Sequence, residues 1–160
     1  MGKCFSNPRN SNQPNENGST LLTFAARNGW SKFVSFLIKK GRDVNAQDRY
    51  GVTPLIASIR GQRIKIVSLL IEKGADLNKM DAHGWSPIHV AVYYKLQDII
   101  KLLAESGANL NTPDETGWTP LTTAIKGGKL DIVSLLIDLD VNLSDRNGCS
   151  PIHMAVYHKS

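Results

Sequence analysis

Residues 81–92 read DAHGWSPIHVAV, and this stretch decides how the rest of the chain is understood. Ser86 lies three residues before His89, with Asp81 upstream, so a nucleophile, a base and a carboxylate all occur within it. The stretch could belong to an active site or to a structural framework. A second copy, NGCSPIHMAVYHK at residues 147–159, favours the framework, because recurring sequence is the signature of a repeated architecture.

The same signature recurs along the chain at a nearly fixed spacing. A Ser or Thr followed by Pro or Leu and then by Leu or Ile occurs five times, at Thr20, Thr53, Ser86, Thr119 and Ser150. The separations are 33, 33, 33 and 31 residues. A period near 33 predicts stacked supersecondary units in which each copy buries its apolar face against the next.

Each copy has the signals of two helices. The hydroxyl residue is typical of a helix N-cap, and the Pro that usually follows suits the first helical position. A second, more apolar helix follows, such as the one containing IVSLLI at 66–71, and glycines are predicted to end these helices in the left-handed conformation: Gly41, Gly74 and Gly107.

Two kinds of turn connect the predicted helices. Between the helices of one copy, the left-handed position is filled by Gly29 and Gly128 but also by Gln62 and Lys95, where a side chain costs on the order of 1 kcal/mol. Between copies, an Asp opens and a Gly completes each turn, which predicts hairpins at Asp48–Gly51, Asp81–Gly84, Asp114–Gly117 and Asp145–Gly148.

These motifs closely resemble the ankyrin repeat, with its Thr-Pro-Leu-His-x-Ala opening, as in SPIHVA at 86–91, and its Gly-Ala-Asp-x-Asn ending, as in GADLN at 74–78. The resemblance covers residues 17–160. It implies an α fold, an ankyrin-repeat solenoid of stacked helix pairs joined by short β-hairpin loops. Repeats are expected to start near residues 17, 50, 83, 116 and 147, the last one incomplete, after a disordered leader at residues 1–16 that is rich in Asn, Ser and Pro.

The repeat also predicts two buried rows of side chains. Leu55, Ile88 and Leu121 occupy one repeat position, and Leu70, Leu103 and Leu136 occupy another. Polar positions recur as well: Asn45, Asn78 and Asn111 close their repeats, where a structural role is expected.

Ser86 and His89 therefore occupy recurring structural positions of the repeat. The position of His89 is filled in the other copies by Thr23, Ile56, Thr122 and His153. The resemblance implies that this residue ties adjacent hairpins by hydrogen bonds. No zinc site is expected, because His83, His89 and Cys149 do not have ligand spacing. The motifs GxxxxGK[ST], GxSxG and HExxH do not occur, so neither catalytic residues nor a cofactor are expected.

Composition and charge narrow the class of protein and partner. With 41% hydrophobic and 21% charged residues, the 160-residue chain has the composition of a soluble domain, and its start lacks the apolar core of a secretory signal, which favours a cytoplasmic protein. Residues 1–80 carry 13 Lys and Arg against 5 acidic residues, whereas residues 81–160 carry 6 against 9. This asymmetry favours an acidic protein partner or an anionic membrane surface; nucleic acid is not expected, because no nucleic-acid-binding motif accompanies the charge.

Exposed positions of the repeat are the candidates for partner contacts. Hairpin tips and the outer side of the first helices are where such stacks vary, and here these positions are rich in aromatic residues and Arg, the types that dominate interface energetics. Trp85 and Trp118 could instead pack along neighbouring hairpins, and Trp30 is expected to pack at the outer edge. The candidate partner-binding residues are Arg49, Tyr50, Arg60, His83, Trp85, Tyr93, Tyr94, Glu115, Trp118 and Lys126.

The expected function is a non-catalytic protein–protein interaction module, a scaffold, adaptor or inhibitor that binds a partner protein through the concave face of its repeats, with no small-molecule substrate. The alternative is that residues 1–160 are the N-terminal targeting or recognition part of a larger enzyme or channel, because the chain stops after the first helix of the fifth copy. That short helix could equally act as the cap of the stack.

The N-terminus carries a possible membrane signal. MGKCFS fits the pattern that marks Gly2 for myristoylation once Met1 is removed. One acyl chain holds a protein only weakly, so a second signal is needed, and either palmitoylation of Cys4 or the basic residues of the front half would supply it. The sequence therefore predicts a cytoplasmic module with a peripheral membrane anchor, or a plain leader that matches the pattern by chance.

Overall fold

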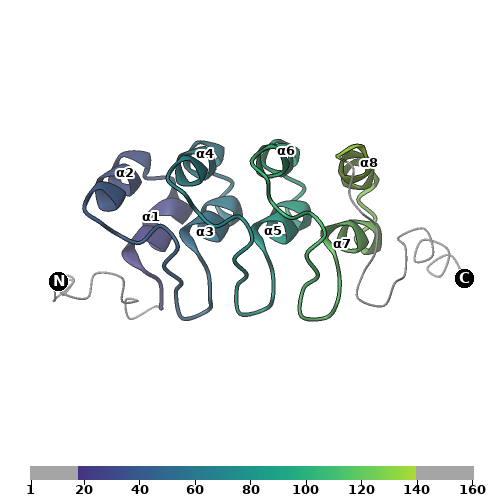
Figure 1. Cartoon of the computed structure of the whole chain (residues 1–160), viewed down its shortest axis with the longest axis horizontal. Helices are drawn as coiled ribbons and strands as arrows, with labels where there is room; N and C mark the ends of the chain where they lie inside the picture. The colour runs from purple at the N-terminus through teal and green to yellow at the C-terminus, as the bar shows by residue number, and fades with distance from the viewer. Residues whose placement is uncertain (1–17, 140–160) are drawn as a thin grey trace, which may run out of the picture. The chain divides into compact units, whose positions relative to one another are not determined.

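The computed structural model describes residues 18–139, which form eight α-helices and no strand (Figure 1). The helices come in pairs, and each pair corresponds to one repeat. The all-α class predicted from the sequence is confirmed. The leader at 1–16, Asp145–Gly148, Cys149 and the fifth copy from 147 onward lie outside the described residues.

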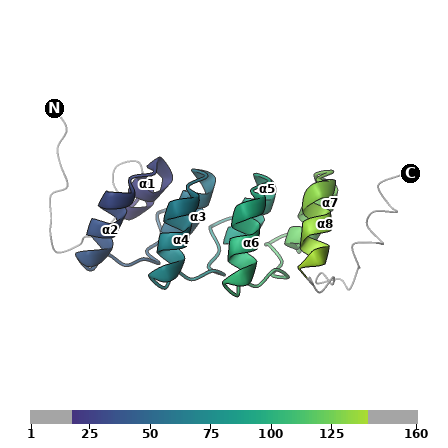
Figure 2. The ribbon, with the colours of Figure 1, turned by 90° about the horizontal axis from the view of Figure 1, so that it is seen from above.

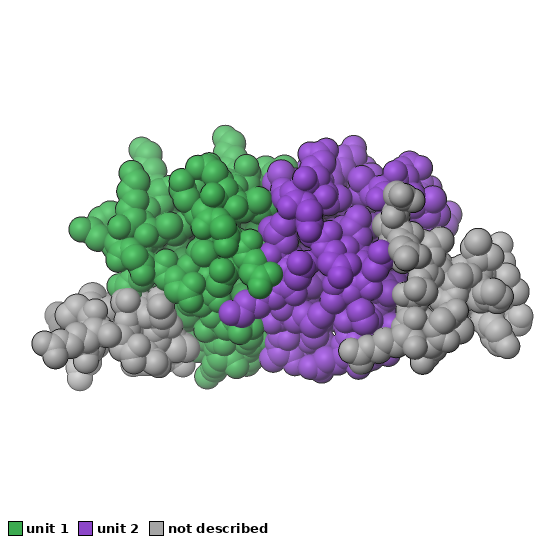
Figure 3. Space-filling view, viewed as in Figure 1, with its two compact units in different colours: residues 1–76 green, residues 77–160 purple. Residues whose placement is uncertain are grey.

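The chain divides into two compact units, residues 1–76 and 77–160 (Figure 3). Unit 1 contains α1 (Leu21–Asn28), α2 (Ser31–Lys39), α3 (Pro54–Arg60) and α4 (Ile64–Glu72), and in it α1 packs on α3 and α2 lies beside α4 (Figure 2). Unit 2 contains α5 (Pro87–Tyr93), α6 (Gln97–Glu105), α7 (Pro120–Lys126) and α8 (Leu130–Asp138), and in it α5 packs on α7. Each unit therefore holds two helix pairs with the first helices in contact.

The first helices begin at the predicted N-caps. The hydroxyl oxygens of Thr20, Thr53 and Thr119 accept hydrogen bonds from the backbone N–H three residues later, at 3.1, 3.2 and 3.2 Å. Ser86 is the N-cap of α5, as predicted, with the same extended backbone, but its hydroxyl does not accept such a bond. Its hydroxyl lies 2.8 Å from Nδ1 of His89 instead, because an imidazole at this position competes for it.

The predicted left-handed positions are confirmed. Between the two helices of a pair, Gly29, Gln62, Lys95 and Gly128 have φ of +87°, +57°, +58° and +62°. Each of these residues allows the chain to reverse direction between the two helices. Two of the four, Gln62 and Lys95, carry a side chain, which the left-handed conformation disfavours. The glycines that end the second helices also have positive φ: Gly41, Gly74 and Gly107.

The connections between repeats turn as predicted, but they form no strand within residues 18–139. In the first of them the backbone N–H of Asp48 donates to the carbonyl of Val52, and the N–H of Gly51 donates to the carbonyl of Asp48, both at 3.0 Å. The Asp48 carboxylate accepts the N–H groups of Tyr50 and Val52. Because the side chain satisfies the remaining donors, a tight loop closes without the ladder of a β-hairpin.

Both predicted rows of core residues are buried. Leu55, Ile88 and Leu121 are 0–1% exposed, and Leu70, Leu103 and Leu136 are fully buried. The second helices bury one stripe rather than most of their circumference: in α4, Ile66 and Val67 are buried, whereas Ile64 is 42% exposed. Only that stripe contributes to the core.

Asparagine side chains join consecutive repeats inside each unit. Asn45 Oδ1 accepts the backbone N–H of Asp76 in unit 1, and Asn78 Oδ1 accepts that of Asn109 in unit 2, both at 2.8 Å. These bonds satisfy backbone donors where the chain leaves a second helix, and they support the structural role predicted for both residues.

None of the helices between residues 18 and 139 has the length and apolar content needed to span a membrane.

Candidate functional site

Ser86 and His89 form a buried structural contact. Both residues are 1% exposed. His89 Nε2 lies 3.0 Å from the carbonyl oxygen of Trp118, which can only accept, so Nε2 carries the proton and Nδ1 accepts from the Ser86 hydroxyl. The carboxylate of Asp81 is bonded to the backbone N–H groups of His83 and Trp85. The pair thus joins two repeats of unit 2, as the resemblance implied.

The environment of His89 keeps its ring neutral. Burial lowers the pKa of His89 below its ordinary value of 6.5, because the charged form loses hydration. The hydrogen bond to the Trp118 carbonyl and the negative charges of Asp114 and Asp81 oppose this shift. A neutral imidazole with one donor and one acceptor matches the two groups that it contacts.

In unit 1 the structure brings together two of the three predicted contact residues. Arg49 donates to the Tyr50 hydroxyl at 2.6 Å, and its guanidinium carbon lies 4.7 Å from the centre of the Tyr50 ring. Both side chains are exposed at the tip of the first loop. Arg60 lies at the last residue of α3 and is half-buried. Unit 1 therefore presents an arginine–tyrosine pair.

The remaining predicted residues lie in unit 2. Two of them, His83 and Glu115, are exposed on neighbouring loops. These loops approach closely at Gly84, where a Cβ would lie 2.5 Å from the backbone nitrogen of Glu115. Gly84 also has φ of +72°. Only glycine satisfies both conditions, and it sets the spacing between the two loops.

An aromatic cluster extends from the loop before α5 to the end of that helix. The Trp85 and Tyr93 ring centres are 5.1 Å apart, and those of Tyr93 and Tyr94 are 5.2 Å apart with the rings perpendicular. Tyr93 is 52% and Tyr94 42% exposed, while Trp85 is half-buried. Trp85 therefore packs against Tyr93 of its own repeat, and both tyrosines are exposed to solvent.

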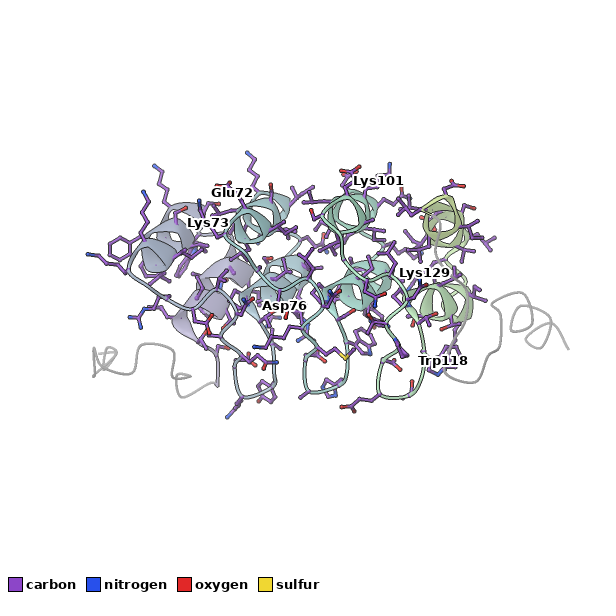
Figure 4. All side chains as sticks on the ribbon, in the orientation of Figure 1. Glu72, Lys73, Asp76, Lys101, Trp118 and Lys129 are labelled. Carbon is purple, nitrogen blue, oxygen red and sulfur yellow. The ribbon has the colours of Figure 1, made fainter. Side chains whose placement is uncertain are left out.

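The next repeat places an equivalent pair 33 residues later. Lys126 Nζ lies 4.3 Å from the centre of the half-buried Trp118 ring, as expected for a cation–π contact. Trp118 and Lys126 occupy the repeat positions of Trp85 and Tyr93. Figure 4 labels Trp118 at the loop end of this repeat.

Lys129 is a member of this surface that the sequence did not reveal. It follows Gly128 in the turn between α7 and α8, and its ammonium lies 5.0 Å from the Tyr93 ring centre (labelled in Figure 4). Lys129 is only 9% exposed. In the other three repeats the equivalent residues are Leu96, Arg63 and Trp30. The repeat pattern therefore did not indicate a surface role for Lys129, apart from the change of residue type. We call Trp85, Tyr93, Tyr94, Trp118, Lys126 and Lys129 the aromatic–lysine face.

A second aromatic cluster lies on α1 and α2 in unit 1. Trp30 meets Phe24 edge to face at 5.5 Å, and Phe33 stacks on Phe36 at 6.2 Å. The packing role predicted for Trp30 is present, yet Trp30 is 49% exposed. Lys40 lies over the Phe36 ring at 5.7 Å. Within residues 18–139, no group of three or more His, Cys, Asp or Glu residues is arranged to hold a metal ion.

The comparisons with known proteins agree with the repeat architecture. A family model described as ankyrin repeats, in three copies, matches residues 3–81 and 88–160. No curated protein compared with the chain matches it. Ankyrin repeats generally act as protein–protein interaction modules and are typically non-catalytic. With four helix pairs in residues 18–139 and a family match over most of its length, the chain belongs to the ankyrin-repeat family.

Proposed function

We propose that this chain is a non-catalytic module that binds a partner protein through the aromatic–lysine face of unit 2. One observation carries the proposal. The same two repeat positions hold a contacting pair in consecutive repeats, Trp85 with Tyr93 and Trp118 with Lys126. The outer member of each pair is exposed, so the surface presents large groups that the core does not use.

The physical properties of these groups suit an interface. Aromatic side chains bury a large area with few rotatable bonds, and Tyr offers a hydroxyl at its outer end. Tyr93 contacts both Trp85 and Tyr94, so little conformational entropy of its side chain would be lost on binding. The tips carrying His83 and Glu115 would form a polar rim.

Unit 1 would add positive charge to the interaction. Arg49 is held by Tyr50, and Arg60 lies at the end of α3. The basic excess of residues 1–80 supports an acidic partner, because opposite charge steers association.

Affinity selection from a cell extract tests the proposal, with the parent and a Trp85→Ala, Tyr94→Ala double variant as baits. We expect the double variant to lose the partners that the parent retains. Leu130→Ala is the matched control, because Leu130 is 76% exposed on α8 and outside the aromatic–lysine face. Thermal melts establish that all three proteins are folded, and equal recovery by folded parent and double variant would reject this face as the binding surface.

A membrane tether would give the module a place to act. It is supported by the match of MGKCFS to the myristoylation pattern, by Cys4 as a second acylation site and by the basic front half. Gly2 and Cys4 lie outside the described residues. In eukaryotic cells, we expect the parent in the membrane fraction and the Gly2→Ala and Cys4→Ser variants in the supernatant. If all three are soluble and the intact mass of the parent shows no acyl group, the tether is wrong.

A further inference from the structure

The Lys129 side chain is held in an unusual place for an ammonium group. It folds back over Gly127, where an added Cβ would lie 3.0 Å from its Cε and 3.1 Å from its Nζ, and it rests over Tyr93. The residue as a whole is 9% exposed, so most of its aliphatic stem is covered, and burial is the main cause that lowers the pKa of its ammonium group. Such a group is normally paired with a carboxylate.

Lys129 has no such pair within the part of the chain that the structure describes. No carboxylate between residues 18 and 139 forms an ion pair with Lys129, Lys95 or Lys126. Burial lowers the pKa of Lys129, and the positive charge of Lys95 lowers it further.

Lys95 is itself placed at a cost. It occupies the left-handed position between α5 and α6 with φ of +58°, where two other repeats have Gly29 and Gly128. A lysine here destabilises the fold relative to glycine, and strained positions often carry side chains that serve a binding surface. Lys95 thus follows Tyr93 by two residues in the chain, and Lys129 of the next repeat rests over the Tyr93 ring.

We propose that Lys129, which rests over Tyr93, and Lys95, two residues after Tyr93 in the chain, together bind a carboxylate in an acidic segment of the partner protein. The inference rests on the proposed function and specifies which group of the partner, a carboxylate, the aromatic–lysine face binds. The partner's Asp or Glu would accept from both ammonium groups, and its apolar neighbours would lie on Tyr94 and Trp85.

The residue types favour a carboxylate over a phosphate group. The described part of unit 2 contains no arginine, the residue whose planar fork suits phosphate. The adjoining tyrosines add apolar area, which suits a peptide with mixed acidic and apolar side chains. A carboxylate would also offset the repulsion between the two lysines, so each would strengthen the contribution of the other.

Selection from a random twelve-residue peptide library displayed on phage tests the inference with the full chain as bait. We expect the recovered peptides to be enriched in Asp and Glu next to apolar residues. Synthetic copies should bind Lys129→Met and Lys95→Gln variants about tenfold or more weakly than the parent. These changes keep the shape: Met retains an apolar stem over Tyr93, and Gln already occupies the equivalent position at Gln62.

Lys101→Met is the matched control. Lys101 is exposed on α6 (Figure 4), so this substitution removes the same charge elsewhere in unit 2. Binding within about twofold of the parent is expected for it. Replacing Glu by Gln in the peptide should weaken binding to the parent and have little effect on binding to Lys129→Met.

The outcomes separate the inference from the proposed function. Peptides that depend on Trp85 and Tyr94 but show no acidic enrichment, or that bind Lys129→Met as well as the parent, would overturn the carboxylate site and leave the protein-binding face. A library that yields no peptide dependent on Trp85 and Tyr94 would count against both. If light scattering shows a dimer that Lys129→Met dissociates, the occupant is a second copy and the acidic segment is wrong.

Discussion

His89 Nε2 lies 3.0 Å from the carbonyl oxygen of Trp118, a residue 29 positions further along the chain. This bond joins the core of one repeat to the loop that carries a main residue of the aromatic–lysine face. The imidazole must stay neutral to accept from Ser86 while it donates to Trp118. The stability of unit 2 is therefore linked to the protonation of one histidine.

The free energy of unfolding should depend on pH through His89. Burial lowers its folded-state pKa below 6.5, so below pH 6.5 the unfolded chain binds a proton that the folded chain does not. The stabilisation is present above pH 6.5 and is lost as the pH falls toward the folded-state pKa.

The chain offers its own replacement, because Thr23 and Thr122 fill the position of His89 in other repeats. At pH 7.5 we expect His89→Thr to be about 1–3 kcal/mol less stable than the parent, because the Trp118 carbonyl loses its donor. In urea titrations from pH 7.5 to 5 this difference should shrink. Parallel stability curves for the two proteins would show that His89 does not titrate as described.

Truncation of a fully buried side chain should be costly. Leu103 is 0% exposed on α6, and Leu103→Ala is expected to lower the free energy of unfolding by about 2–5 kcal/mol through lost burial and a residual cavity. Leu130→Ala, with the parent residue 76% exposed, should change it by about 0.5 kcal/mol or less. Chemical denaturation measures both, and equal losses would contradict the assigned burial.

Relief of the left-handed strain should stabilise the protein. Gln62 has φ of +57° in the turn between α3 and α4, and Gln62→Gly is expected to raise stability by up to about 1 kcal/mol. The same change at Ser68, an exposed position inside α4, should lower stability by about 0.5–1 kcal/mol. Thermal melts that shift in the same direction for both variants would argue against a left-handed conformation at Gln62.

The close approach at Gly84 predicts a steric effect beyond backbone strain. Gly84 and Gly107 both have positive φ, but only at Gly84 would a Cβ meet backbone atoms, those of Glu115, while no atom lies within 4 Å at Gly107. We expect Gly84→Ala to cost about 1–3 kcal/mol more than Gly107→Ala. Comparable denaturation midpoints for the two variants would mean that the loops of unit 2 are not in contact there.

The sequence alone predicted the features that depend on neighbouring residues. The 33-residue period, the caps at Thr20, Thr53 and Thr119 and the left-handed conformation of Gln62 and Lys95 are all confirmed. The caps and the left-handed residues depend on only three or four neighbouring residues. A capping hydroxyl reaches only the first turn of its helix, and a single residue in the left-handed conformation ends a helix. The repeat then placed the core leucines by position alone.

The tertiary structure decided the features that join distant residues. Ser86 matched the capping pattern, but its hydroxyl bonds to the His89 ring, whose other nitrogen is fixed by Trp118 in the next repeat. Lys129 gave no local signal, and its place over Tyr93 arises because α5 packs on α7. Burial and cation–π contacts depend on the distance between side chains from different repeats, and that distance follows from the packing of helices, which no short stretch of sequence encodes.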